Sequence, residues 1–210
     1  AAGGTGGHMF PAQALAEALT ERGWRVVLAT DERGAVYADR FPAEKRIALS
    51  AATYRNGDPI GMARAGVKIV QGVLQARAAF KVIDPAIVIG FGSYPSLPAL
   101  LAALSAKRPA MIHEQNAVLG RVNRLLAKRV DAIATSCQRV DRLKPKFALK
   151  THLVGNPVRA EVLTLRNEPF PPFTENGLLR VLVTGGSQGA SILSQVVPDA
   201  LAMLPAALRT

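Results

Sequence analysis

Short apolar runs alternate with longer helical patterns along most of the 210-residue chain. The runs that are typical of buried strands cover residues 24–30, 46–50, 86–90, 110–113, 132–136, 152–155 and 179–184. Helical patterns cover residues 12–22, 60–81, 97–106, 118–128 and 191–204. Alternation of this kind predicts an α/β fold, in which helices cover both faces of a Rossmann-like parallel sheet.

A glycine-rich segment occurs twice, each time before a helical pattern. The first copy is Gly3-Gly4-Thr5-Gly6-Gly7-His8, and the second is Gly185-Gly186-Ser187-Gln188-Gly189-Ala190. A strand pattern precedes the second copy, whereas only Ala1-Ala2 precede the first. We therefore expect a fragment of a longer protein, with its first strand missing and its second domain incomplete. The aperiodic, proline-containing segment 166–177 places the domains at 1–159 and 160–210.

Composition narrows the class of protein. With 49% hydrophobic residues the chain can build a core, and a single cysteine, Cys137, excludes an intramolecular disulfide and fits a reducing compartment. The uncharged stretch between Asp84 and Lys107 contains prolines and glycines that interrupt a helix, so no membrane span is predicted.

The formal net charge of +11 favours an anionic partner. Aromatic residues make up only 5% of the chain and are not interleaved with the basic ones, as a base-stacking surface would require. Nucleic acid is therefore not the expected partner, which leaves anionic lipids and phosphorylated substrates.

Glycine-rich turns between a strand and a helix let backbone N–H groups approach an anion. Neither copy has the spacing of a dinucleotide fingerprint or the lysine of a P-loop, so tight strand–helix packing is the structural alternative. The copies differ at their last position, where His8 corresponds to Ala190. At a helix N-terminus a histidine is kept neutral, so His8 is a candidate general base or phosphate ligand. Capping of the turn is the alternative.

Polar side chains follow two of the predicted strands. His113-Glu114-Gln115-Asn116 comes after one, and Gly92-Ser93-Tyr94-Pro95-Ser96 after another. The carboxyl ends of strands in open α/β sheets are where such folds bind ligands. For Glu114 and Asn116 the alternative is capping of the next helix, and for segment 92–96 it is an ordinary turn.

The helical pattern 60–81 carries an apolar stripe ringed by cations. Such a helix can lie in a lipid head-group layer, although packing on its own sheet is the commoner arrangement. The stripe consists of Val67, Val70, Val73 and Leu74, and the cations are Arg64, Lys68, Arg77 and Lys81.

Several kinds of chemistry have no motif in the sequence. It contains no Cys/His cluster with metal-ligand spacing, no Asp-x-Asp pair and no Gly-x-Ser-x-Gly elbow. We therefore expect a mechanism without a metal or another cofactor.

Five motifs taken together resemble the MurG family, whose members are undecaprenyldiphospho-muramoylpentapeptide β-N-acetylglucosaminyltransferases of GT-B fold. The resemblance covers the N-terminal domain and the start of the C-terminal one. Its motifs are Gly3–His8 with Pro11, Gly90-Phe91-Gly92-Ser93-Tyr94, His113–Asn116, Gly155-Asn156-Pro157-Val158-Arg159 and Gly185–Ala190.

The resemblance implies transfer of N-acetylglucosamine from UDP-GlcNAc to the 4-hydroxyl of the muramoyl sugar of lipid I, with inversion, to give lipid II. It also implies peripheral binding at the cytoplasmic face of the inner membrane, through the stripe on 60–81. His8 matches the general base or a ligand of the acceptor diphosphate, and Tyr94 and Glu114 lie on the acceptor side. The positions that match donor contacts are Thr5, Gly6, Gly7, Asn116, Arg159 and Ser187.

Two departures from the family pattern stand out. Ser93 replaces a glycine that is common in its motif. The portion that in the family holds the uracil pocket is not part of this chain, so we expect the chain alone to be inactive. Two alternatives remain open: a nicotinamide-dependent oxidoreductase with Asp31 on a ribose, and a membrane-docking acceptor subunit of a split glycosyltransferase.

Overall fold

The computed structural model describes residues 1–35, 41–52, 57–172, 180–185 and 190–205. The chain divides into two compact units, Ala1–Leu163 and Thr164–Thr210. The boundary expected after Arg159 falls just inside the first unit and stays a prediction. The two units are taken separately below.

Parallel strands form the centre of the first unit, as the alternating pattern predicts. β1 (Val27–Thr30) pairs with β2 (Lys45–Ala48). A second sheet has the order β3 (Val88–Gly90), β4 (Ala110–Glu114), β5 (Ala132–Thr135) and β6 (Thr151–Leu153), with every pair parallel.

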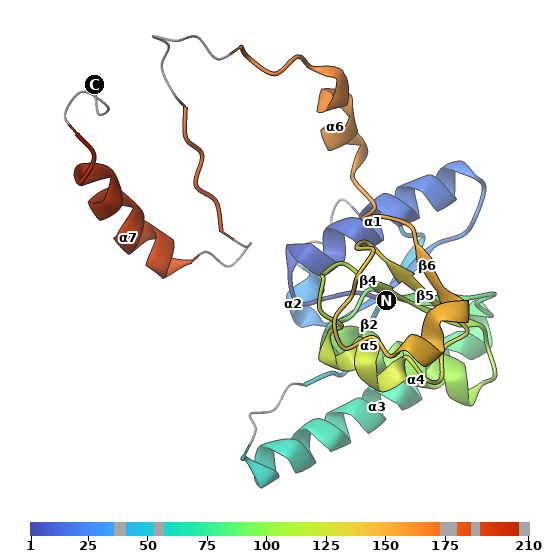
Figure 1. Ribbon diagram of the computed structural model, residues 1–210. Coiled ribbons are helices and arrows are strands. Elements are labelled where there is room, and N and C mark those ends of the chain that lie inside the picture. Colours follow the sequence, from blue (N-terminus) through green and yellow to red (C-terminus); the bar gives the residue numbers. More distant parts are fainter. Residues whose placement is uncertain (36–40, 53–56, 173–179, 186–189, 206–210) are drawn as a thin grey trace. The chain divides into compact units, whose positions relative to one another are not determined.

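Helices lie on both faces of β1. Leu28 packs in a cluster with Met9 and Ala12 of α1 (Gly6–Glu21), whereas the next residue, Ala29, packs in the cluster formed with the helices on the other side. Successive side chains of a strand point to opposite faces, so α1 covers one face and α4 the other (Figure 1). The remaining elements of this unit are α2 (Glu32–Ala35), α3 (Pro59–Ile83), α4 (Ser93–Ser105), α5 (Arg121–Leu126), the 3-10 helix η1 (Pro145–Lys150) and α6 (Ala160–Leu163).

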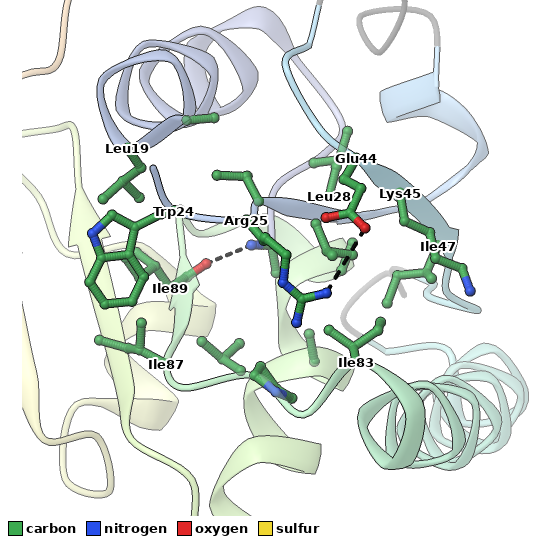
Figure 2. Close-up of a pocket in the computed structure, with 18 of the residues that line it drawn as sticks. Leu19, Trp24, Arg25, Leu28, Glu44, Lys45, Ile47, Ile83, Ile87 and Ile89 are labelled. Atoms are coloured by element: carbon green, nitrogen blue, oxygen red, sulfur yellow. Dashed lines mark hydrogen bonds and ion pairs between the residues drawn. The ribbon is translucent and has the colours of Figure 1, made fainter. Parts of the chain in front are cut away.

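Ala1 and Ala2 lie between β1 and β3 and bond to both. Ala2 N donates to Ala29 O at 3.1 Å, Phe91 N donates to Ala1 O at 3.0 Å, and the terminal amine donates to Ile89 O at 2.6 Å. Burial lowers the pKa of this amine to about 5. Beside these bonds, a cavity of about 530 Å³ lies between β1 and β3 and is lined by residues of both strands (Figure 2). The two sheets are therefore joined by the first residues of the chain.

α5 begins later than the pattern over 118–128 predicts. Leu119 N donates to Asp141 O at 2.9 Å and Asp141 N donates to Ala117 O at 2.7 Å. These bonds hold residues 117–119 extended beside the segment after β5, so helical geometry starts only at Arg121.

The second unit contains the 3-10 helix η2 (Thr164–Asn167) and α7 (Ser191–Ala202). The strand expected at 179–184 is wrong for the described residues 180–184, which form no strand. A strand needs a neighbour to satisfy its backbone groups, and no strand is formed by the described residues of this unit. The expected helix at 191–204 is confirmed as α7.

Candidate functional site

The first glycine loop combines glycines that packing requires with one that it does not. A Cβ at Gly3 would lie 2.7 Å from Pro95 Cβ, and Gly4 has a φ of +85°. These two glycines therefore fit the packing alternative. A Cβ at the exposed Gly7 would meet only Thr5 Oγ1, at 3.8 Å. Its surroundings are open, as an approaching ligand would need, and the Thr5 side chain makes no capping bond to α1.

His8 lies in the first turn of α1 and reaches the ends of two strands. Its Nδ1 is 2.8 Å from Phe91 O, after β3, and 3.1 Å from Gln115 Oε1, after β4. Both neighbours are acceptors, so Nδ1 carries the proton and Nε2 the lone pair. Among the described residues no hydrogen bond is made to Nε2. His8 therefore does more than cap its own turn: it presents a basic nitrogen at the carboxyl edge of the sheet.

His113 is buried and is the first residue of the polar motif after β4, residues 113–116. Its Nε2 lies 3.0 Å from Gly155 O, its Nδ1 lies 2.9 Å from Gln115 Nε2, and its ring packs on Phe91 with centroids 5.4 Å apart. Burial lowers the pKa of His113, against the opposing effects of the Gly155 bond and the Glu114 charge. His113 is therefore held neutral.

Glu114 is buried, and four donors surround its carboxylate. Oε1 accepts from the backbone N–H of Asn116 at 3.1 Å and from its Nδ2 at 3.0 Å. Oε2 accepts from Gly120 N at 2.8 Å and from Asn123 Nδ2 at 2.9 Å. Glu114 thus shapes the loop and orients Asn116, and its expected place on the acceptor side stays a prediction.

Asn116 does not cap the following helix, whose N-cap is Gly120 and has no side-chain bond. It is exposed, with its amide N–H turned to Glu114. The capping alternative for Asn116 is therefore wrong, and its expected contact with the donor stays a prediction.

The turn after β3 brings Gly92 against the site. A Cβ at Gly92, whose φ is +81°, would lie 3.4 Å from the His8 ring and 3.3 Å from Asn123 Nδ2. Ser93 has a φ of 61°, a conformation that favours the glycine it replaces. Tyr94 lies on another side, where it lines a hollow with Ile69 of α3 and Arg121 of α5.

Arg159 lies against α1. Its guanidinium is 4.0 Å from the centroid of the Phe10 ring, and it also pairs with Glu161 at 3.8 Å. Residues from three distant motifs therefore meet around the start of α1: His8 contacts Gln115, and Phe10 contacts Arg159. Ser187, the remaining donor-site candidate, lies outside the described residues.

α3 exposes much of its expected apolar stripe. Val67 and Val70 are each 59% exposed and Leu74 is 61% exposed, whereas Val73 is half-buried against the core. Arg64, Lys68, Arg77 and Lys81 are exposed on the same helix. For three of the four stripe residues the packing alternative is therefore wrong.

Reasoning from sequence assigned no role to Gln115, although it stands inside a motif that was singled out. Asn123 was missed as well, because its contact with Glu114 depends on where α5 begins.

In the part of the chain that the structure describes, no cluster of three or more His, Cys, Asp or Glu could hold a metal ion. The described helices include none with both the length and the apolar character for a bilayer crossing.

Asp31 does not fit a ribose ligand. The residue is 7% exposed, and its carboxylate accepts from Gly34 N at 3.0 Å, in the turn that opens α2. Asp31 follows β1, where the oxidoreductase alternative places it, but its carboxylate is used within the fold.

Two known proteins with similar sequences share one description. A protein of Caulobacter vibrioides (strain NA1000 / CB15N) is 62% identical over all of this chain, and one of Novosphingobium aromaticivorans is 60% identical, also over all of it. Both are described as "UDP-N-acetylglucosamine--N-acetylmuramyl-(pentapeptide) pyrophosphoryl-undecaprenol N-acetylglucosamine transferase". This chain spans 57% of the first relative and 54% of the second.

A solved structure of a MurG protein has a similar fold. The crystal structure of Acinetobacter baumannii MurG superposes with a TM-score of 0.70 at 28% identity, over 97% of this chain and 56% of that one. Residues 1–135 match the family described as "Glycosyltransferase family 28 N-terminal domain". With this match over more than half its length, and with the glycine loop and His8 placed at the edge of a parallel sheet, the chain belongs to glycosyltransferase family 28.

Proposed function

We propose that this chain supplies the acceptor-binding half of an enzyme that transfers N-acetylglucosamine from UDP-GlcNAc to the 4-hydroxyl of the muramoyl sugar of lipid I, giving lipid II. The similarity to the Caulobacter and Novosphingobium transferases supports the substrates. The observation that carries the chemistry is His8, whose Nδ1 faces two acceptors and whose Nε2 is left as the base.

His8 acts on the acceptor hydroxyl in this proposal. As the hydroxyl oxygen bonds to the anomeric carbon, the proton moves to His8 Nε2. The bond from that carbon to the diphosphate breaks, and UDP leaves with the electron pair. Because the hydroxyl attacks opposite the leaving group, the configuration inverts.

The end of the glycine loop and the loop after β4 give the donor-side contacts. Thr5, Gly6 and Gly7 offer backbone N–H groups and the positive end of α1 to phosphate oxygens. Asn116 and Arg159 are both accessible and fixed by neighbours, Asn116 by Glu114 and Arg159 by Phe10. Ser187 completes the donor set in this proposal, and Tyr94 and Glu114 belong to the acceptor side.

The exposed stripe on α3 holds the enzyme at the cytoplasmic face of the membrane, where a lipid-linked acceptor is found. Val67, Val70 and Leu74 enter the head-group layer, and the cations around them pair with anionic lipids. The net charge of +11 supports the same partner.

The test uses a chimera in which residues 1–210 replace the corresponding part of the Caulobacter relative. Incorporation of labelled N-acetylglucosamine into a lipid I analogue is measured, with nicotinamide-cofactor binding as a parallel assay. We expect turnover in the chimera, and a fall of roughly 100-fold or more in kcat for His8→Ala with donor KM nearly unchanged.

The matched control is His152→Ala, which removes an exposed histidine of β6. It should keep the turnover of the unmodified chimera. A folded chimera without transfer would overturn the proposed activity, and undiminished kcat in His8→Ala would remove His8 from the reaction.

A further inference from the structure

A continuous line of hydrogen bonds crosses the carboxyl edge of the four-stranded sheet. It starts at Phe91 O, which lies 2.8 Å from His8 Nδ1, and passes over 3.1 Å to Gln115 Oε1. From Gln115 Nε2 it continues over 2.9 Å to His113 Nδ1, and His113 Nε2 lies 3.0 Å from Gly155 O. Both ends of the line are backbone carbonyls.

The two carbonyls determine the direction of every bond between them. A carbonyl oxygen only accepts, so His113 Nε2 must donate to Gly155 and His8 Nδ1 must donate to Phe91. His113 Nδ1 is then an acceptor and needs the Gln115 N–H.

The Gln115 amide fits in one orientation only. Its Nε2 also donates to His113 O at 3.1 Å, so exchanging its oxygen and nitrogen would place two oxygens at that distance. The exchange would also give His8 Nδ1 a donor in place of an acceptor. The oxygen of Gln115 is therefore directed at His8.

We propose that Gln115 is a positioning residue: oriented by His113, it holds His8 in the tautomer with the proton on Nδ1 and the lone pair on Nε2. The neutral state of His113 supports this, because an imidazolium could not accept from Gln115. The line joins the glycine loop, the turn after β3, the motif after β4 and the segment after β6. The tautomer can be measured on its own, whereas its use in proton transfer rests on the proposed function.

The test is a long-range ¹H–¹⁵N spectrum of the imidazoles in the 210-residue chain, recorded without substrates at a pH where they are neutral. The chain has three histidines. We expect His8 as the Nδ1–H tautomer and His113 as the Nε2–H tautomer. An Nε2–H tautomer at His8 in the unmodified chain would overturn the proposal before any variant is made.

Two substitutions test the oxygen and the nitrogen of the Gln115 amide separately. Gln115→Leu removes one of the two acceptors at His8 Nδ1, so the Nε2–H fraction of His8 should rise roughly fivefold, as expected for one lost hydrogen bond. Gln115→Glu keeps an acceptor toward His8 but loses the donor to His113, so His8 should keep its tautomer while His113 gains a proton on Nδ1.

Gln75→Leu is the matched control, because Gln75 Oε1 accepts from Ser50 N away from the site. It should leave the signals of His8 and His113 unchanged. An unchanged His8 tautomer in Gln115→Leu would refute the positioning role. Gln115→Leu can also shift the His8 tautomer without lowering kcat of the chimera. In that case the positioning role of Gln115 is supported, and the proposed use of His8 as the base is refuted.

Discussion

Asn123 Nδ2 donates to Glu114 Oε2 at 2.9 Å, and both residues are 1% exposed. The bond ties α5 to the end of β4, and Gly120 N donates to the same carboxylate oxygen at 2.8 Å. A buried carboxylate with four donors around it organises the loop that presents Gln115 and Asn116.

Glu114→Ala should lower the free energy of unfolding by about 3 kcal/mol, because it leaves buried donors without an acceptor. Urea denaturation of the 210-residue chain measures this loss. Glu17→Ala is the control: among the described residues Glu17 accepts one local bond, from Gln13 on α1, so its loss should cost under about 1 kcal/mol. Equal losses in the two variants would show that the Glu114 network does not stabilise the fold.

Ser93→Gly should stabilise the chain. Ser93 has a φ of 61°, where a side chain is strained, and relief of this strain should gain about 0.5–1 kcal/mol after the greater freedom of glycine in the unfolded chain is counted. Thermal unfolding should show a higher Tm. Ser105→Gly, at the other end of α4, should lower it, because the hydroxyl of Ser105 bonds to Ala102 O at 2.9 Å. A lower Tm for Ser93→Gly would mean that its side chain contributes more than its backbone costs.

In a chain that begins with a free Ala1 amine, burial of that amine makes stability depend on pH. Its pKa is about 5 in the folded chain against 8.0 ordinarily, so between these values the unfolded chain binds more protons. Stability should therefore rise from pH 5 to pH 8, by up to about 1.4 kcal/mol per pH unit from this group. Chemical denaturation of a chain that begins with a free Ala1 amine measures the slope.

Acetylation of Ala1 is the control for that slope. The acetylated nitrogen keeps an N–H for Ile89 O but no longer titrates, and every other group, His113 included, is unchanged. The difference in slope between the two forms isolates the amine. Identical slopes would show that the amine is hydrated in the folded chain.

Leu74→Glu should weaken binding to vesicles that contain anionic lipid by roughly tenfold or more, since it removes an apolar side chain that would enter the lipid layer and adds repulsion from the anionic head groups. Sedimentation with phosphatidylglycerol–phosphatidylethanolamine vesicles measures the partition. Leu149→Glu is matched in chemistry: Leu149 is fully exposed on η1, outside the stripe. If both variants bind alike, α3 is not the docking surface.

The sequence predicted the strands and helices of the first unit well, because alternating apolar runs and helical periods are local signals. It failed at 180–184, where an apolar run has no strand beside it among the described residues of its unit. It also misplaced the start of α5, because the bonds of residues 117–119 to Asp141 depend on a segment much later in the chain.

The candidate site was predictable as a set of motifs but not as an arrangement. His8 stood out because its counterpart in the second loop is an alanine, and Asn116 because it follows a strand. The direction of the Gln115 amide depends on two carbonyls, Phe91 O and Gly155 O, that no sequence pattern indicates. The buried role of Glu114 likewise appears only when α5 closes over it.

The place of Ala1 and Ala2 between β1 and β3 has a consequence for how the molecule is made. These residues bond to Ala29 and also to Ile89 and Phe91, so the segment before α1 waits for segments synthesised much later. Contacts of such long sequence separation slow folding, because the intervening loop must close first. A nascent chain halted before Phe91 should stay open to proteases, and assembly of the layer should begin only after that point.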